Sequence, residues 1–214
     1  MGKKENRRCL ILGQAEIKDY ETMRRYLRPD DYVVCCDGGF RHAEGLGIPA
    51  DLIVGDFDSI EKPELDTEII VLPREKDDTD SVFAVKECLR RGYQSFLFLG
   101  VIGQRLDHTL GNLSILLMLD TLGCKALMAD DLSEMEIVSR RPASVPERFP
   151  LFSLICTGEE ASGIEITGAK YPLSGGRITA EYQYGISNEV LPGQEARISV
   201  REGRLLLIRL RNAS

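Results

Sequence analysis

The residues of this chain best suited to chemistry are two carboxylates in the stretch Gly55-Asp56-Phe57-Asp58-Ser59. The stretch follows the apolar run Leu52-Ile53-Val54, which has the composition of a buried strand. Side chains two residues apart on an extended chain point the same way, so Asp56 and Asp58 are placed to hold one hard cation. Asp, Gly and Ser also form ordinary turns, and the pentapeptide alone leaves both interpretations open.

A second acidic group, Asp77-Asp78-Thr79-Asp80, lies further along the chain. Mg²⁺ takes oxygen ligands of this kind, and it keeps some water when it also binds phosphates. Alone, the group is better explained as a helix start, with Asp78 or Thr79 as the cap and Asp80 in the first turn. Together, the two acidic groups predict a Mg²⁺ site formed by Asp56, Asp58 and Asp80.

Two glycines follow another apolar run, Tyr32–Cys36, in Asp37-Gly38-Gly39. Gly38 and Gly39 would let the backbone approach a nucleotide, and Asp37 could bond a hydroxyl or assist the metal; a tight turn is the alternative. The chain has neither a Gly-x-x-x-x-Gly-Lys-Ser/Thr loop nor a Gly-x-Gly-x-x-Gly fingerprint. A nucleotide enzyme built on this sequence must therefore have another design.

The most unusual stretch runs from Gly100 to His108, Gly-Val-Ile-Gly-Gln-Arg-Leu-Asp-His. Arg105, between a strand and a helix, can clamp phosphate with two hydrogen bonds, and Asp107 can accept a bond from a polar ligand. The alternative is a surface ion pair between Arg105 and Asp107, with His108 merely packed. Asn112, about one helical turn beyond His108, either reaches the same site or faces water.

The elements that must position these motifs alternate between strands and helices. Strands are expected at Cys9–Leu12, Tyr32–Cys36, Leu52–Val54, Glu68–Leu72, Ser95–Leu99 and Cys124–Met128. Helices are expected over Asp19–Leu27 and Phe40–Leu46, from Asp78 or Thr79 to Gly92, and after a cap at Asp107 or Thr109, with Leu110, Leu113 and Leu117 inward. This alternation predicts a mostly parallel sheet covered by helices on both faces. Ligands bind outside the carboxyl ends of such strands, so the four motifs should share one edge.

The pattern changes after about residue 131, where helical periodicity fades and prolines separate short apolar runs. These runs include Leu151–Cys156, Ile164–Ile166 and Ile178–Tyr184. Near the end, Arg197–Val200 and Arg204–Leu210 flank Glu202-Gly203, which predicts a hairpin. We expect an all-β sandwich or barrel here, and therefore an α/β domain over residues 1–130 and a β domain over residues 131–214.

Composition excludes several classes of protein. The 214 residues carry a net charge of -7, which argues against a nucleic-acid partner. No apolar run approaches the roughly 20 residues of a membrane helix, and the first residues do not resemble a secretory signal, so a cytoplasmic protein is expected. The six cysteines lack Cys-x-x-Cys spacing and are interpreted as reduced core residues.

Taken in order, these motifs resemble thiamine pyrophosphokinase. The resemblance is carried by Asp37-Gly38-Gly39, Gly55 to Ser59, Thr79-Asp80, and Gly100-x-x-Gly103-x-Arg105-x-Asp107-His108 with Asn112. Late in the chain, Gly185-Ile186-Ser187-Asn188-Glu189 resembles the Ser-Asn element of that family's second domain. The chain departs from the family pattern at Gln104, where a second glycine is frequent.

The resemblance implies an α/β nucleotide domain followed by a β-sandwich, a homodimer, and thiamine bound where the subunits meet. It implies transfer of the diphosphoryl group of ATP to thiamine, giving thiamine diphosphate and AMP. Asp56, Asp58 and Asp80 would hold Mg²⁺ on ATP, while Arg105 and Asp107 line the reaction site. The nucleotide would contact Asp37, Gly38, Gly39, Thr79, His108 and Asn112. Thiamine would contact Asp107, Ser187 and Asn188, with Tyr182 or Tyr184 as candidates to support its rings.

Three points stay open from the sequence. The base that takes the hydroxyl proton is an acidic residue such as Asp56 or Asp107. Another Mg²⁺-dependent phosphotransferase acting on a small alcohol would show the same motifs on the sheet edge. A non-catalytic nucleotide or thiamine sensor would also keep metal ligands.

Overall fold

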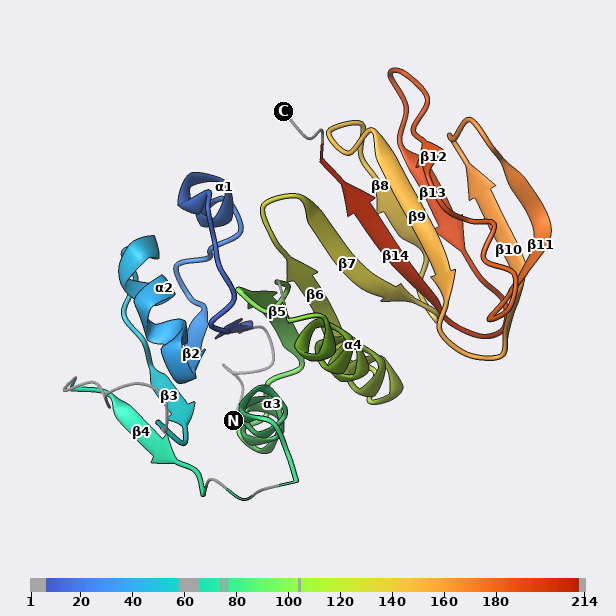
Figure 1. Ribbon diagram of the computed structural model, residues 1–214. Coiled ribbons are helices and arrows are strands. Elements are labelled where there is room, and N and C mark those ends of the chain that lie inside the picture. Colours follow the sequence, from blue (N-terminus) through green and yellow to red (C-terminus); the bar gives the residue numbers. More distant parts are fainter. Residues whose placement is uncertain (1–6, 58–65, 74, 76, 104, 212–214) are drawn as a thin grey trace. The chain divides into compact units, whose positions relative to one another are not determined.

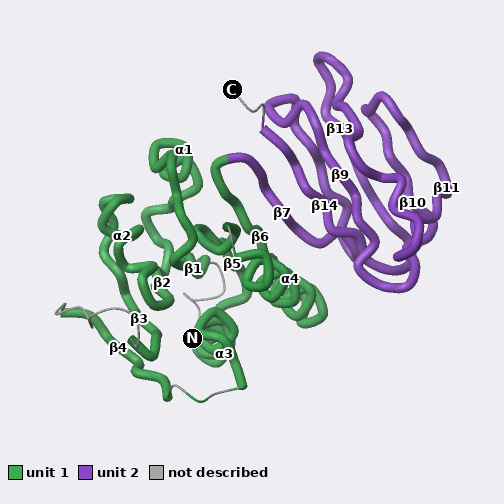
Figure 2. Tube along the Cα trace, viewed as in Figure 1, with its two compact units in different colours: residues 1–131 green, residues 132–214 purple. Residues whose placement is uncertain are grey.

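The structure is a computed structural model that describes residues 7–57, 66–73, 75, 77–103 and 105–211. Asp58, Ser59 and Gln104 of the motifs above lie outside these residues. The chain divides into two units, Met1–Asp131 and Leu132–Ser214 (Figure 2). Each unit has its own hydrophobic core.

The described part of the first unit contains six strands, which pair with one another in parallel. They are β1 (Cys9–Leu12), β2 (Tyr32–Cys36), β3 (Leu52–Gly55), β4 (Glu68–Val71), β5 (Ser95–Leu99) and β6 (Lys125–Ala129), in the spatial order β6-β5-β1-β2-β3-β4. The chain moves outward from β1 to β4, then returns to the other side of β1 with β5. Such a reversal opens a crevice at the carboxyl ends of the two central strands, here β1 and β5.

Helices cover both faces of this sheet, as the alternation of elements predicts. Figure 1 shows α1 (Tyr20–Arg24) and α2 (Phe40–Leu46) on one face, and α3 (Asp80–Arg90) and α4 (Leu106–Thr121) on the other. Alternate residues of β1 serve the two faces: Leu10 and Leu12 belong to the cluster that contains Met23 of α1, whereas Cys9 contacts Cys88 of α3. Burial on both faces explains why the strands read as continuous apolar runs.

The start of α4 differs from its prediction. Thr79 caps α3 as expected, since its hydroxyl oxygen accepts from the Val82 amide at 3.3 Å, but α4 begins at Leu106 after Arg105 and has no side-chain cap. The prediction that Asp107 or Thr109 caps this helix is wrong. So is the inward placement of Leu110, whose surface is 58% exposed. Apolar residues occur all round α4, so periodicity could not identify the face that packs on the sheet.

No described helix is long and apolar enough to cross a membrane.

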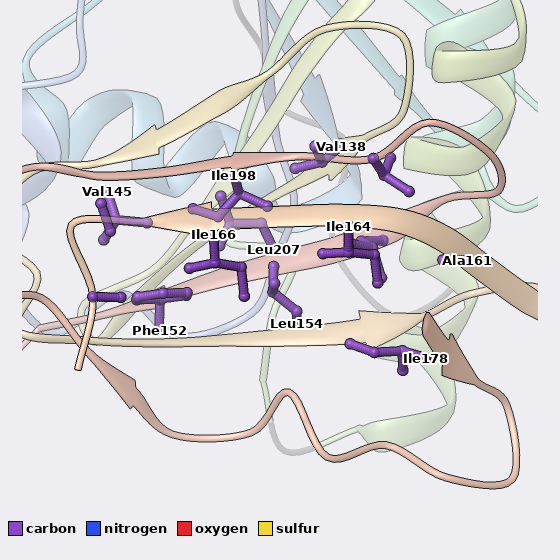
Figure 3. Close-up of a cluster of buried hydrophobic side chains, with 14 of the residues drawn as sticks. Val138, Val145, Phe152, Leu154, Ala161, Ile164, Ile166, Ile178, Ile198 and Leu207 are labelled. Carbon is purple, nitrogen blue, oxygen red and sulfur yellow. The ribbon is translucent and has the colours of Figure 1, made fainter. Parts of the chain in front are cut away.

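The second unit is an antiparallel sandwich, as predicted. One sheet has the order β12-β9-β14-β7 and the other β11-β10-β13-β8. The strands are β7 (Ser133–Val138), β8 (Ala143–Val145), β9 (Leu151–Cys156), β10 (Glu160–Thr167), β11 (Leu173–Thr179), β12 (Asn188–Glu189), β13 (Ala196–Ser199) and β14 (Leu205–Leu210). Figure 3 shows side chains of both sheets meeting in the core, among them Phe152 and Leu207 from one and Ile166 and Ile198 from the other.

The predicted hairpin at Glu202-Gly203 is wrong. β13 pairs with β8 and β10, whereas β14 pairs with β7 and β9. The turn therefore carries the chain from one sheet of the sandwich to the other. Turn residues predict where a chain reverses but not which strands it joins, and sandwiches contain both kinds of connection.

The outermost strand of the first unit, β4, is tied to α3 by ion pairs. Arg91 bonds Glu68 on β4 at 2.6 Å and Glu87 on its own helix at 2.6 Å. Hydrogen bonds from Arg90, and then from Arg91, lower the pKa of the nearly buried Glu87 to about 2. This network holds β4 against α3, and β4 pairs with β3, the strand that ends at Gly55.

We predict that Glu87→Gln lowers the free energy of unfolding near neutral pH by about 1–3 kcal/mol, the usual contribution of a hydrogen bond to a charged group. Because the folded pKa of Glu87 lies below its unfolded value, its contribution is present above the unfolded pKa and is lost as pH falls from about 4.5 toward about 2. Urea unfolding across this range should therefore show a smaller acid-induced loss in the variant than in the wild type.

The matched control is Glu44→Gln, since Glu44 is an exposed carboxylate of α2. Its unfolding curves should follow those of the wild type at each pH. Identical pH dependence for the wild type and Glu87→Gln would show that the Glu87 network does not contribute to acid stability.

Candidate functional site

The carboxyl ends of β1 and β5 are joined through the backbone of the loops that follow them. The Gly13 amide donates to the Leu99 carbonyl at 2.9 Å, and the Ala15 amide donates to the Gly100 carbonyl at 2.8 Å. These bonds close the two loops on each other where the strand order reverses. The loop after β1, residues 13–15, did not stand out in the sequence because it lacks charged residues; the strand-end rule is the signal that could have found it.

The end of β2 brings Asp37 toward the end of β3. Asp37-Gly38-Gly39 forms a turn of 3-10 helix, η1, directly after β2. A Cβ atom at Gly55 would overlap the Asp37 carboxylate, and one at Gly39 would overlap the carbonyl oxygen of Leu12 at the end of β1. The motifs at Asp37 and Gly55 therefore meet at one edge of the sheet, as predicted for strands that run parallel.

Asp80 reaches the same region from α3, which it begins. Its Oδ1 atom and that of Asp37 are both buried. Burial raises the pKa of the Cys36 thiol at the end of β2, and the charges of Cys35, Asp80 and Asp37 raise it further. Both carboxylates thus lie close enough to the end of β2 to act on Cys36.

Donors suited to a hard cation follow β2 and β3 and begin α3. Asp37, Asp56 and Asp80 offer carboxylate oxygens, the ligands that Mg²⁺ prefers, and Asp56 is partly buried. In the part of the chain that the structure describes, no three His, Cys, Asp or Glu side chains form a complete metal site. Asp58, which we expect to be a ligand, lies outside that part.

Backbone strain is concentrated in the motifs singled out from the sequence. Among the described residues other than glycine, positive φ occurs at Asp37 (45°), Phe57 (52°) and Ser187 (59°). Left-handed backbone costs such a residue about 1 kcal/mol or more, and it persists where surrounding contacts enforce it. Each of the three belongs to a motif predicted to bind nucleotide, metal or substrate.

Arg105 and Asp107 form a two-pronged ion pair before and within the first turn of α4. The guanidinium Nε and Nη2 donate to Asp107 Oδ1 and Oδ2 at 2.9 and 2.7 Å. The side chains are 71% and 64% exposed, so the contact is the surface ion pair considered as an alternative. The hydrogen bond from Arg105 holds the pKa of Asp107 well below its usual range. His108 beside them is exposed.

Asn112 ties α4 to the loop after β5. Its side-chain amide donates to the Val101 carbonyl at 2.8 Å. The Thr109 hydroxyl accepts from the Gly103 amide of the same loop at 3.2 Å. Both contacts hold the loop from Gly100 to Gly103 against the helix that carries Arg105 and Asp107.

In the second unit, Ser187 and Asn188 have different environments. Ser187 is exposed, and its amide donates to the Ser153 hydroxyl at 3.1 Å. Asn188 is buried; its Oδ1 accepts from the Tyr171 amide at 3.1 Å and its Nδ2 donates to the Tyr171 carbonyl at 2.8 Å. Asn188 therefore fixes the backbone of Tyr171 beside β12.

Four exposed apolar side chains lie close to this element in the sequence or are bonded to it, and we call them together the tyrosine patch. Its members are Tyr171, Tyr182, Tyr184 and Ile186, which are 59%, 68%, 42% and 50% exposed. The rings of Tyr182 and Tyr184 lie 5.4 Å apart. Exposed aromatic side chains grouped in this way are typical of surfaces that bind another molecule.

Comparison with known proteins finds one family along most of the chain. The model of the thiamin pyrophosphokinase catalytic domain matches residues 23–128, and the model of the thiamin pyrophosphokinase vitamin B1 binding domain matches residues 136–205. Thiamine pyrophosphokinase of Bacillus subtilis (strain 168) is 29% identical over 163 residues, which are 72% of this chain and 76% of that protein.

Solved structures share the fold over nearly the full length. A thiamine pyrophosphokinase from Bacillus subtilis has a TM-score of 0.85 at 24% identity, covering 96% of this chain and 99% of that chain. A thiamin pyrophosphokinase from Geobacillus thermodenitrificans has a TM-score of 0.83 at 26% identity, covering 97% of this chain and 99% of that chain.

We predict that Gly39→Ala destabilises the first unit by about 1–3 kcal/mol, the usual cost of inserting a methyl group where none fits. The added carbon would overlap the Leu12 carbonyl, a backbone atom that cannot turn aside. Gly158→Ala is the matched control, since a Cβ atom there meets nothing within 4 Å. Urea unfolding of both variants measures the difference. Equal free energies of unfolding would mean that η1 does not pack on β1 as described.

Proposed function

This chain belongs to the thiamin pyrophosphokinase family, and we propose that it transfers the diphosphoryl group of ATP to thiamine, giving thiamine diphosphate and AMP. One observation carries the proposal: the catalytic and the vitamin B1 binding models of this family match the chain in order, one in each structural unit. A protein that used only the nucleotide domain would not need the second match.

We propose that residues 1–130 bind ATP and that residues 131–214 bind thiamine. In the first domain, Asp37, Gly38, Gly39, Thr79, His108 and Asn112 are the proposed nucleotide contacts. Gly38 and Gly39 are buried within η1, and Gly39 lets this turn pass close to the end of β1, so their proposed part is to set the backbone at the nucleotide site. Thr79 also caps α3, and Asn112 also bonds the loop after β5, so both hold the backbone around the proposed site.

Asp56, Asp58 and Asp80 are the proposed ligands of Mg²⁺. Their support is the oxygen character of the set and its place in the fold, since Asp56 follows β3 and Asp80 begins α3. When bound, the ion supplies positive charge on the phosphate oxygens of ATP. The chain itself has a net charge of -7, so these carboxylates need a cation before an anionic nucleotide can approach them.

The reaction forms a bond between the hydroxyethyl oxygen of thiamine and the β-phosphorus of ATP. It breaks the bond from that phosphorus to the oxygen shared with the α-phosphorus, and AMP leaves with this oxygen. Arg105 is the proposed donor to the phosphate oxygens, for which its guanidinium must leave or share its pairing with Asp107. This rearrangement costs little free energy, because the pair is exposed and exposed ion pairs contribute about 1 kcal/mol or less.

The hydroxyl proton passes to a carboxylate, and Asp56 and Asp107 are the two candidates. A carboxylate whose pKa is held low by a guanidinium is a weak base. Asp107 has this environment while it stays paired with Arg105, and Asp56 would share its oxygens with Mg²⁺, so both are kept as candidates.

Ser187 and Asn188 are the proposed thiamine residues of the second domain. Ser187 offers an exposed hydroxyl, while Asn188 shapes the site through the backbone of Tyr171. Tyr182 and Tyr184 offer faces on which the thiamine rings can stack.

We propose that the protein is a homodimer in which thiamine binds between subunits. The support is exposed apolar surface in both units: Leu106 and Leu110 on α4 are 66% and 58% exposed, and the tyrosine patch lies on the β domain. A second copy would cover such surfaces. We also place the enzyme in the cytoplasm, a reducing compartment in which all six cysteines would remain the free thiols found here.

The first test is the identity of the products. Purified protein incubated with MgATP and thiamine should release AMP and thiamine diphosphate in equal amounts, resolved by chromatography or ³¹P NMR. ADP with thiamine monophosphate would indicate a simple kinase. No turnover despite binding of both ligands would favour a sensor and contradict the proposal.

The second test separates two neighbouring carboxylates. Asp80→Asn should lower kcat/KM by about 100-fold or more and raise the Mg²⁺ concentration needed for half-maximal rate, since the ion would lose a charged ligand. Asp78→Asn is the control, because Asp78 pairs with Lys86 at 2.6 Å and should stay within about threefold of the wild type, as expected for an exposed ion pair. Similar rates for Asp80→Asn and the wild type would remove Asp80 from the metal site.

A further inference from the structure

A chain of two hydrogen bonds runs from α1 through α2 to the loop after β1. The Tyr20 hydroxyl lies 2.7 Å from His42 Nδ1, and His42 Nε2 lies 2.9 Å from the Ala15 carbonyl oxygen. A carbonyl only accepts, so Nε2 carries the hydrogen and donates it. Burial lowers the pKa of His42. In the neutral ring that burial favours, Nδ1 accepts from Tyr20, so the direction of both bonds is defined.

Ala15 is held from both sides of its backbone. Its carbonyl accepts from His42, while its amide donates to the Gly100 carbonyl at 2.8 Å. A Cβ atom at Gly103 would lie 2.9 Å from the Ala15 side chain, so this side chain also packs closely on the loop after β5. The two loops at the reversal of strand order are thus fixed by one residue, and His42 supplies one of its bonds.

His42 and its two hydrogen bonds also belong to the helix that follows η1. α2 begins at Phe40, directly after Asp37-Gly38-Gly39. A Cβ atom at Gly45 of α2 would lie 2.6 Å from the Tyr20 ring, so Tyr20 packs on the same helix that carries His42. A rigid α1–α2 pair therefore sets the loop after β1 relative to the proposed nucleotide residues after β2.

We propose that His42, oriented by Tyr20, is a positioning residue for ATP: it holds the loop of residues 13–15 against Gly100 so that the exposed Gln14 and the neighbouring backbone present a fixed surface to the nucleotide. His42 acts through Ala15 and does not itself touch the ligand. The inference rests on the proposed function only in placing ATP at this edge of the sheet. None of the residues assigned above to nucleotide, metal or thiamine supplies this contact.

The test measures ATP affinity directly, by titration calorimetry in Mg²⁺, beside steady-state kinetics. His42→Leu removes both bonds and should weaken ATP binding about tenfold, while Tyr20→Phe removes one and should weaken it about threefold, as the net value of a hydrogen bond implies. His42→Gln keeps a donor that can reach the Ala15 carbonyl and should recover binding to within about threefold of the wild type. KM for thiamine should stay unchanged in all three variants.

Tyr32→Phe is the matched control, since the Tyr32 hydroxyl accepts from Arg91, which lies at the opposite end of α3 from Asp80. It should bind ATP as the wild type does. Wild-type affinity in His42→Leu overturns the inference, whatever the turnover. Parallel loss of stability and of affinity for both substrates, without recovery in His42→Gln, also overturns it by making His42 a merely structural residue.

Failure of the proposed function gives a different pattern. Wild-type protein that binds ATP but forms no thiamine diphosphate contradicts the proposed reaction, while the ranking of the variants by ATP affinity still decides the role of His42. Wild-type protein that binds no ATP contradicts both.

Discussion

The sheet of the first unit is buried on both faces, and this constraint decides where polar chemistry can lie. Strands such as β1 and β5 consist of residues with almost no exposed surface, so a charged side chain within them would lose its hydration without compensation. Polar groups are therefore confined to the strand ends. Because every pair is parallel, the carboxyl ends gather on one edge, and the acidic and glycine-rich motifs meet there although they lie far apart in the sequence.

That edge concentrates negative charge in a chain that is already acidic. Asp37 and Asp80 both act on the charge of Cys36, so both contribute negative charge near the end of β2. Negative charge of this kind favours a bound cation, so the proposed metal and the proposed nucleotide would bind interdependently. The Arg105 guanidinium, just before α4, is engaged by Asp107. The proposed polyphosphate ligand would have to contact both this guanidinium and the metal held by the carboxylates.

Much of the first unit was predictable because its signals agree. The bounds of β1, β2, β5 and α2 match the predictions, since continuous apolar runs or helical spacing end at glycine or a polar residue. Where signals were ambiguous the prediction failed. Apolar residues occur on every side of α4, so their spacing does not show that Leu110 is exposed. Glu202-Gly203 turns the chain without pairing the strands beside it. The role of His42 could not be foreseen, because a lone histidine in a helix carries no information about the carbonyl that it meets.

The Ser-Asn element shows that a matching motif identifies a position more reliably than a chemical role. The side-chain oxygen and nitrogen of Asn188 both bond the backbone of Tyr171, so this side chain shapes the surface rather than facing it. Ser187 next to it is exposed and adopts a left-handed backbone, φ 59°. Buried, fully bonded side chains are a means of enforcing such strain in a neighbour. The first unit has a similar arrangement, in which the partly buried His42 bonds the loop that exposes Gln14. In both units the residues proposed to face the ligand depend on partners that do not face it, so binding should respond to changes well outside the residues that touch it.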